Sequence, residues 1–345
     1  MALAKNFTSI NILRILAGFS VILIHTTDPF LLFHQYVGGL SWWIIYYLNT
    51  LGKTAVPIFI MISGYLLLNP EKVEKVGVFY KRRLRRVGTP LLLWVTIYFI
   101  WREFWGKVDV DLWHIIKALL TVDLGPLYFL VVILELYLLA PYILKFTKKG
   151  KIEAKMVLTT LVMSMAIVAI PYYFFQNKFS VSQNILTIAL PYSFYFLAGG
   201  YFRTFDFKKY VRLALLCLSL ILCFVTIRWA NGDFDGYYTS YFSPTVILMS
   251  VSIFLTIKGF EHRFEKGFSQ NQKQVVQYLS TTILGIFLIH PYVLDVMRGY
   301  TKLTPGNIYS PLWLVILGIV LLVFVVCLLL VMIGKKIPLV KYLFE

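Results

Sequence analysis

The sequence predicts an all-α fold, a polytopic membrane helical bundle with about ten transmembrane helices and both termini cytoplasmic. Three observations lead to this prediction. The 345 residues are 59% hydrophobic and only 14% charged. Apolar runs of the ~18 to 20 residues needed to cross the hydrocarbon core of a bilayer recur along the whole chain. The lysines and arginines gather in alternate loops, which fixes the expected orientation in the membrane.

Hydropathy places ten spans one after another along the chain. They cover residues 7–28, 42–68, 88–105, 126–146, 156–175, 185–203, 211–229, 240–258, 276–298 and 311–334. The first span has no small-residue cleavage site after it, so we expect a retained helix rather than a signal peptide. No loop exceeds about twenty residues, and none could bury a core of its own. The sequence therefore predicts a single membrane domain, residues 1–345.

The net charge of +17 is distributed unevenly between the two sides of the predicted bundle. When alternate loops are assigned to alternate sides, 23 of the 33 Lys and Arg fall on the side that holds both termini, and seven fall on the other. This asymmetry follows the positive-inside rule, so we expect cytoplasmic termini and no nucleic-acid partner. The three cysteines, Cys217, Cys223 and Cys327, lie within spans, where we expect small buried hydrophobes, neither a disulfide framework nor a zinc site.

Two ionisable residues interrupt the apolar stretch "NILRILAGFSVILIHTTDP" of the first span. Eleven residues make about three helical turns, so Arg14 and His25 project from one face, about 16 Å apart along the axis. A histidine can take a proton from an attacking hydroxyl and return it, and Asp28, one turn further on, could orient the ring. The alternative is that Arg14 extends to the cytoplasmic headgroups and His25 sits at the outer interface, with no further role.

A cluster of basic residues precedes the third span, in "YKRRLRRVGTPLLLW". Arg83 and Arg86 are spaced i, i+3, so on an α-helix they would share a face and could bind one phosphate or diphosphate group. A cytoplasmic nucleotide-bearing donor would suit such a pair. The alternative is that these charges set the topology and contact anionic lipids.

The second span carries Lys53, Pro57, Ser63 and Gly64 within "GKTAVPIFIMISGYLLLNP". The proline predicts a kink, and the small residues predict close approach by a neighbouring helix. Lys53 either faces a cavity or reaches the outer surface, and Ser63 is a further polar candidate for contact with substrate.

Two further polar residues lie within later spans. Glu135 lies near the middle of the fourth span, where an unpaired carboxylate is costly, so we expect a positive or hydroxyl partner rather than a role in catalysis. His290 comes directly before Pro291 in the ninth span, and we expect it to hydrogen-bond a backbone group that the proline leaves free. The chain contains no Gly-rich phosphate loop, nucleophile elbow or metal-spaced His/Cys cluster, so no metal site is expected.

Taken in order, these segments resemble the acyltransferase-3 family of bacterial integral membrane acyltransferases, particularly the single-domain members that O-acetylate surface glycans. The resemblance covers essentially the whole chain. It depends on the Arg-x10-His pair Arg14 and His25, on "VPIFIMISGYLL", and on the Arg-x-x-Arg of Arg83 and Arg86 ahead of proline. It continues in "GPLYFLVVILELYLLAPYI" and "STTILGIFLIHPYV".

The resemblance implies transfer of an acyl group, usually acetyl, from cytoplasmic acetyl-CoA or another short acyl-CoA to a carbohydrate hydroxyl at the outer face of a bacterial cytoplasmic membrane. By it, His25 is the catalytic base or acyl relay and Arg14 its intramembrane partner. Arg83 and Arg86 bind the donor. The expected partners are the acyl-CoA donor, the carbohydrate acceptor and membrane lipids, with no tightly bound cofactor. A homo-oligomer is left open.

A second interpretation belongs to a different functional class. In a transporter or flippase of a polysaccharide, or of its lipid-linked precursor, the same charged residues would line a translocation path. A basic pair on the cytoplasmic side and a histidine on the outer side favour group transfer. A transporter should instead offer polar residues along several facing helices.

Overall fold

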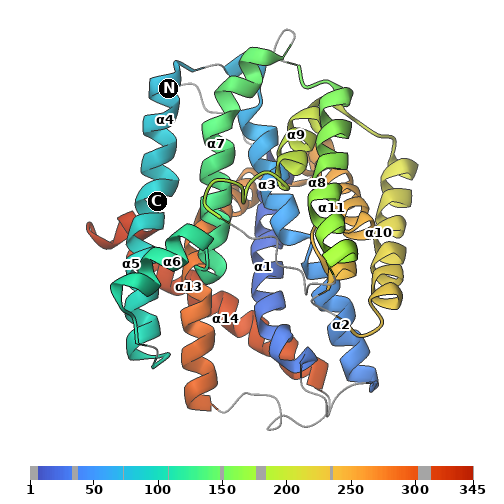
Figure 1. Ribbon diagram of the computed structural model, residues 1–345. Helices are drawn as coiled ribbons and strands as arrows, with labels where there is room; N and C mark the ends of the chain where they lie inside the picture. The colour runs from blue at the N-terminus through green and yellow to red at the C-terminus, as the bar shows by residue number, and fades with distance from the viewer. Residues whose placement is uncertain are drawn as a thin grey trace. The chain divides into compact units, whose positions relative to one another are not determined.

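The computed structural model describes residues 7–32, 38–72, 74–107, 109–147, 151–175, 184–233, 236–301 and 312–344. Over these ranges the chain forms helices joined by turns and contains no β-strand, which confirms the all-α prediction (Figure 1).

Eight helical segments in the described part of the chain are long and apolar enough to cross a membrane. They are Thr8–Leu31, Leu40–Leu67, Gly125–Phe146, Ala154–Phe174, Lys209–Ala230, Tyr237–Gly267, Gln270–Tyr300 and Leu312–Gly334. Each coincides with a predicted span. The protein is therefore a multi-pass membrane protein.

The other two predicted spans have a different local structure. Over 88–105 the chain forms α5 (Thr89–Phe104), which has only 16 residues. Over 185–203 it forms turns followed by the nine-residue helix α9 (Ser193–Tyr201). The count of ten spans and the cytoplasmic location of the termini stay predictions.

The contacts divide the chain into two compact units. The first contains Met1–Ile62 and Phe205–Ile333, and the second contains Ser63–Thr204 and Gly334–Glu345. The prediction of one membrane domain is neither confirmed nor contradicted by this division.

The first unit is built around α1 (Thr8–Leu31), which packs on its neighbours in the same unit. These are α2 (Leu40–Gly52), α11 (Pro244–Lys258), α12 (Glu261–Gly267) and α13 (Gln270–Thr301). The unit also contains α10 (Lys209–Ala230) and most of α14 (Leu312–Gly334).

Small side chains allow α1 and α13 to approach closely. A Cβ added at Gly18 would lie 2.7 Å from Cγ2 of Ile283, so glycine is what permits the contact at this level. Nearer the start of both helices, the Ser280 hydroxyl donates a hydrogen bond to Oδ1 of Asn11, 2.9 Å away. These contacts fix the axial position of α1 against α13, and that position sets the geometry of the site described below.

The N-terminus of α1 is capped by a carboxylate from α12. Glu261 accepts hydrogen bonds from the backbone N–H of Thr8 at 3.0 Å and of Ser9 at 2.7 Å. The first N–H groups of a helix have no partner within the helix, and they carry the positive end of its dipole. The cap therefore satisfies two of these donors with a group of the opposite charge.

Most of the second unit's residues lie in α4 (Val76–Arg83), α5, α6 (Leu112–Thr121), α7 (Tyr128–Phe146), α8 (Ala154–Phe175) and α9. A single π-helical turn, Leu84–Gly88, joins α4 to α5. The three pieces follow one another without a break, so residues 76–104 form one long helical rod (Figure 1).

The predicted kink in the second span is confirmed. Helix α2 ends at Gly52, residues 53 and 54 form a turn, and α3 (Ala55–Leu67) begins just before Pro57. Proline has no N–H to donate to the carbonyl four residues earlier, which belongs to Lys53, so the helix is interrupted there.

The predicted close approach at Gly64 is also confirmed. A Cβ built on Gly64 would overlap the backbone carbonyl of Phe196 in α9, a group that cannot move aside as a flexible side chain could. Cys217, by contrast, corrects a prediction. Cys223 and Cys327 are buried, but Cys217 is exposed on α10, and all three cysteines are free.

Replacing Gly64 with alanine is expected to destabilise the second unit. Overpacking of a tight contact costs about 1–3 kcal/mol, which outweighs the ~1 kcal/mol that alanine gains over glycine within a helix. Thermal unfolding in detergent measures the effect, with Gly318→Ala as the control, because nothing lies within 4 Å of a Cβ at Gly318 in α14. Equal melting temperatures for the two variants would contradict the prediction.

Candidate active site

Two histidines from α1 and α13 face each other within the first unit. The ring centroids of His25 and His290 are 5.2 Å apart, and the rings are tilted by 36°. His25 is partly buried and His290 is fully buried. The sequence indicated His25 as a candidate catalytic group, but it gave no sign that the second imidazole lies beside it.

One ring nitrogen of His290 makes the hydrogen bond that the sequence led us to expect. Nδ1 lies 2.7 Å from the carbonyl oxygen of Phe287. In an uninterrupted helix this carbonyl would accept from the N–H of residue 291, which is a proline and has none. The structural role of His290 at Pro291 is thus present in the fold. The other nitrogen, Nε2, is buried and has no hydrogen-bond partner among the described residues.

Arg298, two turns beyond His290 on α13, ties the two helices together. Its Nη2 donates a hydrogen bond to the backbone carbonyl of His25 at 2.5 Å. The guanidinium also interacts electrostatically with Asp295 and Asp28. Arg298 lies 273 positions from His25 in the sequence, so no helical spacing relates the two residues.

Asp28 is held by a residue of α2. Nδ2 of Asn49 donates to Oδ1 of Asp28 at 2.7 Å and to the hydroxyl of Thr27 at 2.9 Å. The Thr27 hydroxyl can accept this bond because its own hydrogen points to the carbonyl of Leu23, 2.7 Å away. Asn49 is fully buried, and sequence reasoning missed it. That Asp28 orients His25 stays a prediction.

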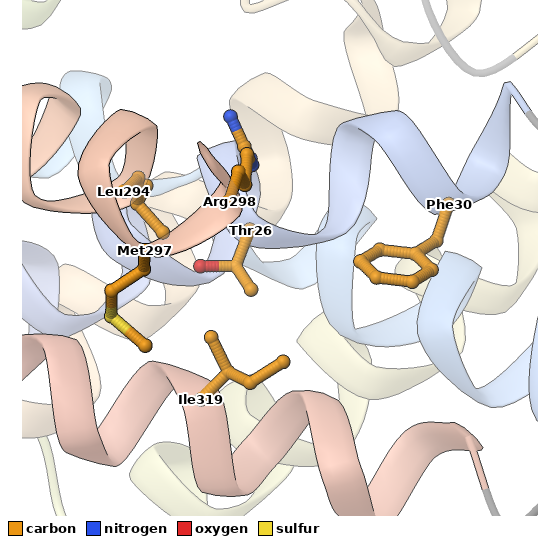
Figure 2. Close-up of a pocket in the computed structure, with 6 residues that line it drawn as sticks. All are labelled: Thr26, Phe30, Leu294, Met297, Arg298 and Ile319. Carbon is orange, nitrogen blue, oxygen red and sulfur yellow. The ribbon is translucent and has the colours of Figure 1, made fainter. Parts of the chain in front are cut away.

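A small cavity lies beside the Arg298 contact (Figure 2). Thr26 and Phe30 line it from α1, Leu294, Met297 and Arg298 from α13, and Ile319 from α14. Its volume is about 10 Å³, which is room for about one water molecule. In this conformation the cavity is too small for an acyl group or a sugar ring.

Arg14 lies on the same unbroken helix as His25 and is partly buried. Because α1 is continuous from Thr8 to Leu31, the eleven-residue spacing does place the two residues on one face. The function of Arg14 remains a proposal.

Arg83 and Arg86 lie in the second unit, at the junction of α4 with the π-helical turn. The Arg83 guanidinium carbon is 5.3 Å from the centre of the Phe79 ring and 5.9 Å from that of Tyr137. Its Nε is buried and has no hydrogen-bond partner within the part of the chain that the structure describes. Burial lowers the pKa of Arg83 from its usual value. Arg86 is exposed.

The π-helical turn changes the expected relation between these two arginines. The i, i+3 argument assumed α-helical geometry, but Leu84–Gly88 forms hydrogen bonds of the wider i, i+5 type. Arg83 and Arg86 therefore do not have the relation on one helix face that i, i+3 spacing gives on an α-helix. π-turns within α-helices are frequent at functional sites, which keeps this junction a candidate.

The remaining polar candidates lie in three different surroundings. Lys53 is buried at the turn between α2 and α3, which does not fit the alternative that it reaches the surface. The Ser63 hydroxyl is 3.4 Å from that of Tyr137. Glu135 accepts a hydrogen bond from the backbone N–H of Ala189 at 3.3 Å. This partner is a main-chain amide, whereas we expected a positive or hydroxyl group.

The second unit contains a larger, polar cavity that the sequence did not predict. Its volume is about 110 Å³, and the charged residues that line it include Arg102, Asp109, Lys117 and Asp123. His114, also in the lining, pairs with Asp111 at the start of α6 at 2.8 Å. Hydrogen bonds from the backbone and side chain of His114 lower the pKa of Asp111.

The chain matches a known protein family over most of its length. The family model described as "Acyltransferase domain", of the acyltransferase-3 type, matches residues 7–332. The chain belongs to the acyltransferase-3 family. All the polar candidates described above, in both units, fall within the matched residues of this acyltransferase-3 chain.

Relatives of this acyltransferase-3 chain occur in Staphylococcus aureus. Proteins of strains MSSA476 and MRSA252, each named "Probable poly-beta-1,6-N-acetyl-D-glucosamine export protein", are 24% identical to it over 302 residues. The alignment covers 83% of this chain and 82% of each relative. No solved structure matches the chain.

Proposed function

We propose that this protein is a membrane O-acyltransferase of a bacterial cytoplasmic membrane. It transfers acetyl from cytoplasmic acetyl-CoA to a hydroxyl of a cell-surface or lipid-linked glycan at the outer face. The observation that carries the proposal is an imidazole, His25, within a membrane-spanning helix of a chain that an acyltransferase-domain model matches over residues 7–332. An imidazole can accept the hydroxyl proton near neutral pH, which makes the oxygen a better nucleophile.

In this proposal the acyl group and the acceptor hydroxyl meet at His25. The hydroxyl oxygen attacks the thioester carbonyl carbon, and the His25 ring takes the proton. The carbon–sulfur bond then breaks, and the proton returns to the thiolate of CoA. The names of the Staphylococcus aureus relatives refer to a polymer of N-acetylglucosamine, so a glycan of that chemistry is the first acceptor to test.

The test uses purified protein in liposomes, with labelled acetyl-CoA on one side and poly-N-acetylglucosamine on the other. We expect label on the glycan hydroxyls only when the protein is present. Glycan that crosses the membrane without gaining label would contradict the proposal.

Export of a polysaccharide is the second candidate function. The observation that favours it is the printed name of the relatives, which describes an export protein. The same liposomes distinguish the two functions, because export moves the glycan between compartments and acyl transfer changes its mass.

Arg14 gives a prediction about charge and shape. If Arg14 holds a phosphate or carboxylate with its planar guanidinium, Arg14→Lys keeps the charge but loses the paired hydrogen bonds. We expect acetyl transfer to fall by roughly tenfold or more, since a hydrogen bond to a charged group contributes about 1.5–3 kcal/mol. The control is Arg228→Lys, because Arg228 is exposed near the end of α10. Full activity of Arg14→Lys would contradict the prediction and show that the positive charge of Arg14 is sufficient for its role.

A further inference from the structure

The unused nitrogen of His290 needs an explanation. His290 is 0% exposed within a membrane-spanning helix, where a polar group without a partner is costly. Its structural bond to Phe287 is complete and uses only Nδ1. A residue that served only to satisfy the carbonyl freed by Pro291 would not need a second ring nitrogen.

The hydrogen bond to Phe287 also fixes the tautomer of His290. A carbonyl oxygen can only accept, so Nδ1 must carry the hydrogen. In the neutral ring Nε2 is then the unprotonated nitrogen, with a lone pair available to accept a hydrogen bond. This buried acceptor has no partner among the described residues, and the His25 ring lies across from it with a centroid separation of 5.2 Å.

The surroundings of His25 make such an acceptor useful. When His25 takes a proton, its ring becomes positive in a site that already contains the Arg298 guanidinium, bonded to the His25 carbonyl. Asp28 and Asp295 also interact with Arg298. A protonated imidazole is a stronger hydrogen-bond donor than a neutral one, so a neutral acceptor beside the ring stabilises the positive charge on His25.

We propose that His290 is a positioning residue for His25, which accepts a hydrogen bond from one ring nitrogen of His25 while the other takes the proton of the acceptor hydroxyl. This inference rests on the proposed function. The hydroxyl proton goes to His25, the carbon–oxygen bond forms, the carbon–sulfur bond breaks, and the proton leaves with the thiolate. His290 keeps its own proton on Nδ1 throughout. The ring centroids are 5.2 Å apart, which brings the two rings close enough for a hydrogen bond between their nitrogens to form in the substrate complex, because catalytic hydrogen bonds often tighten only when the substrate binds.

The test separates the two nitrogens of His290. In His290→Asn the side-chain amide N–H can take the place of Nδ1 and bond Phe287, but nothing replaces Nε2. We expect kcat for acetyl transfer to fall by about 10²-fold or more, with little change in the Michaelis constant for the donor and a melting temperature near that of the natural protein. His290→Gln places a carbonyl oxygen near the position of Nε2, and we expect it to recover part of the lost rate.

Thr282→Val is the matched control. Thr282 is fully buried on α13, and its hydroxyl donates to the carbonyl of Leu279 in its own helix, at 2.8 Å, so this variant should keep its rate. A kcat within about threefold of the natural protein for folded His290→Asn would overturn the inference and leave a purely structural histidine. Absence of acetyl transfer by the natural protein is a different result, because it refutes the proposed function itself.

Discussion

Replacing His25 with alanine is expected to abolish acyl transfer while the protein still reaches the membrane in normal amount. Loss of general acid–base catalysis costs about 10² to 10⁴ in rate. The fold should survive, because the α1–α13 contact at this level includes the Arg298 bond to the His25 backbone carbonyl, which alanine also has. The measurement is label transferred to the glycan per folded protein.

The control for this substitution is His262→Ala. His262 is exposed on α12, in the same unit as His25, so its replacement removes an imidazole of no expected importance. Normal acetylation by folded His25→Ala would remove the central claim about the site.

Most membrane-spanning helices could be predicted from the sequence, because a long apolar run has few alternatives to a helix in lipid. The segments 88–105 and 185–203 differ for local reasons. The segment 88–105 is the last part of a longer helical rod, which begins within the basic stretch before it. The charged residues of that stretch lower its mean hydropathy, so a search for apolar runs does not detect the start of the rod. In the second, the chain forms turns before Ser193, and Glu135 accepts from the backbone of Ala189 within them.

From the sequence, only those site residues that lie on the same helix could be placed relative to one another. Arg14, His25 and Asp28 share α1, so helical spacing relates them directly. Asn49 and His290 come to this site from α2 and α13, and a single sequence carries no distance between residues so far apart. The signal that could have indicated His290 is its position directly before Pro291. The carbonyl that the proline leaves free bonds to one ring nitrogen, and this bond does not explain the other ring nitrogen.

The donor side gives the second large effect. If Arg83 and Arg86 bind the phosphates of a CoA thioester, the double change Arg83→Gln with Arg86→Gln should raise the Michaelis constant for the donor about 10- to 100-fold. Each charge-assisted hydrogen bond contributes about 1.5–3 kcal/mol, and 1.4 kcal/mol corresponds to a factor of ten. The Michaelis constant for the acceptor should change much less.

The structure shows which control this prediction needs. Arg83 packs against Phe79 and Tyr137, so its replacement also removes contacts that stabilise the fold, and donor binding must be compared among variants with equal melting temperatures. Arg82→Gln with Arg85→Gln removes the same charge from the same stretch. Both of these arginines are exposed, and the ion pair of Arg82 with Glu74, at 2.7 Å, lies at the surface.

The comparison of the two double variants decides between a donor site and a topology signal. Orientation in the membrane should survive both, because five of the seven basic residues between 72 and 86 remain in each. Binding of acetyl-CoA to protein in nanodiscs, repeated at rising salt, is then the informative measurement, since a contact between phosphate and the exposed Arg86 is screened. Weaker binding only in the variant that lacks Arg83 and Arg86 supports the donor site. Equal donor affinity in both variants would leave these arginines as a topology signal and move the donor site elsewhere in the protein.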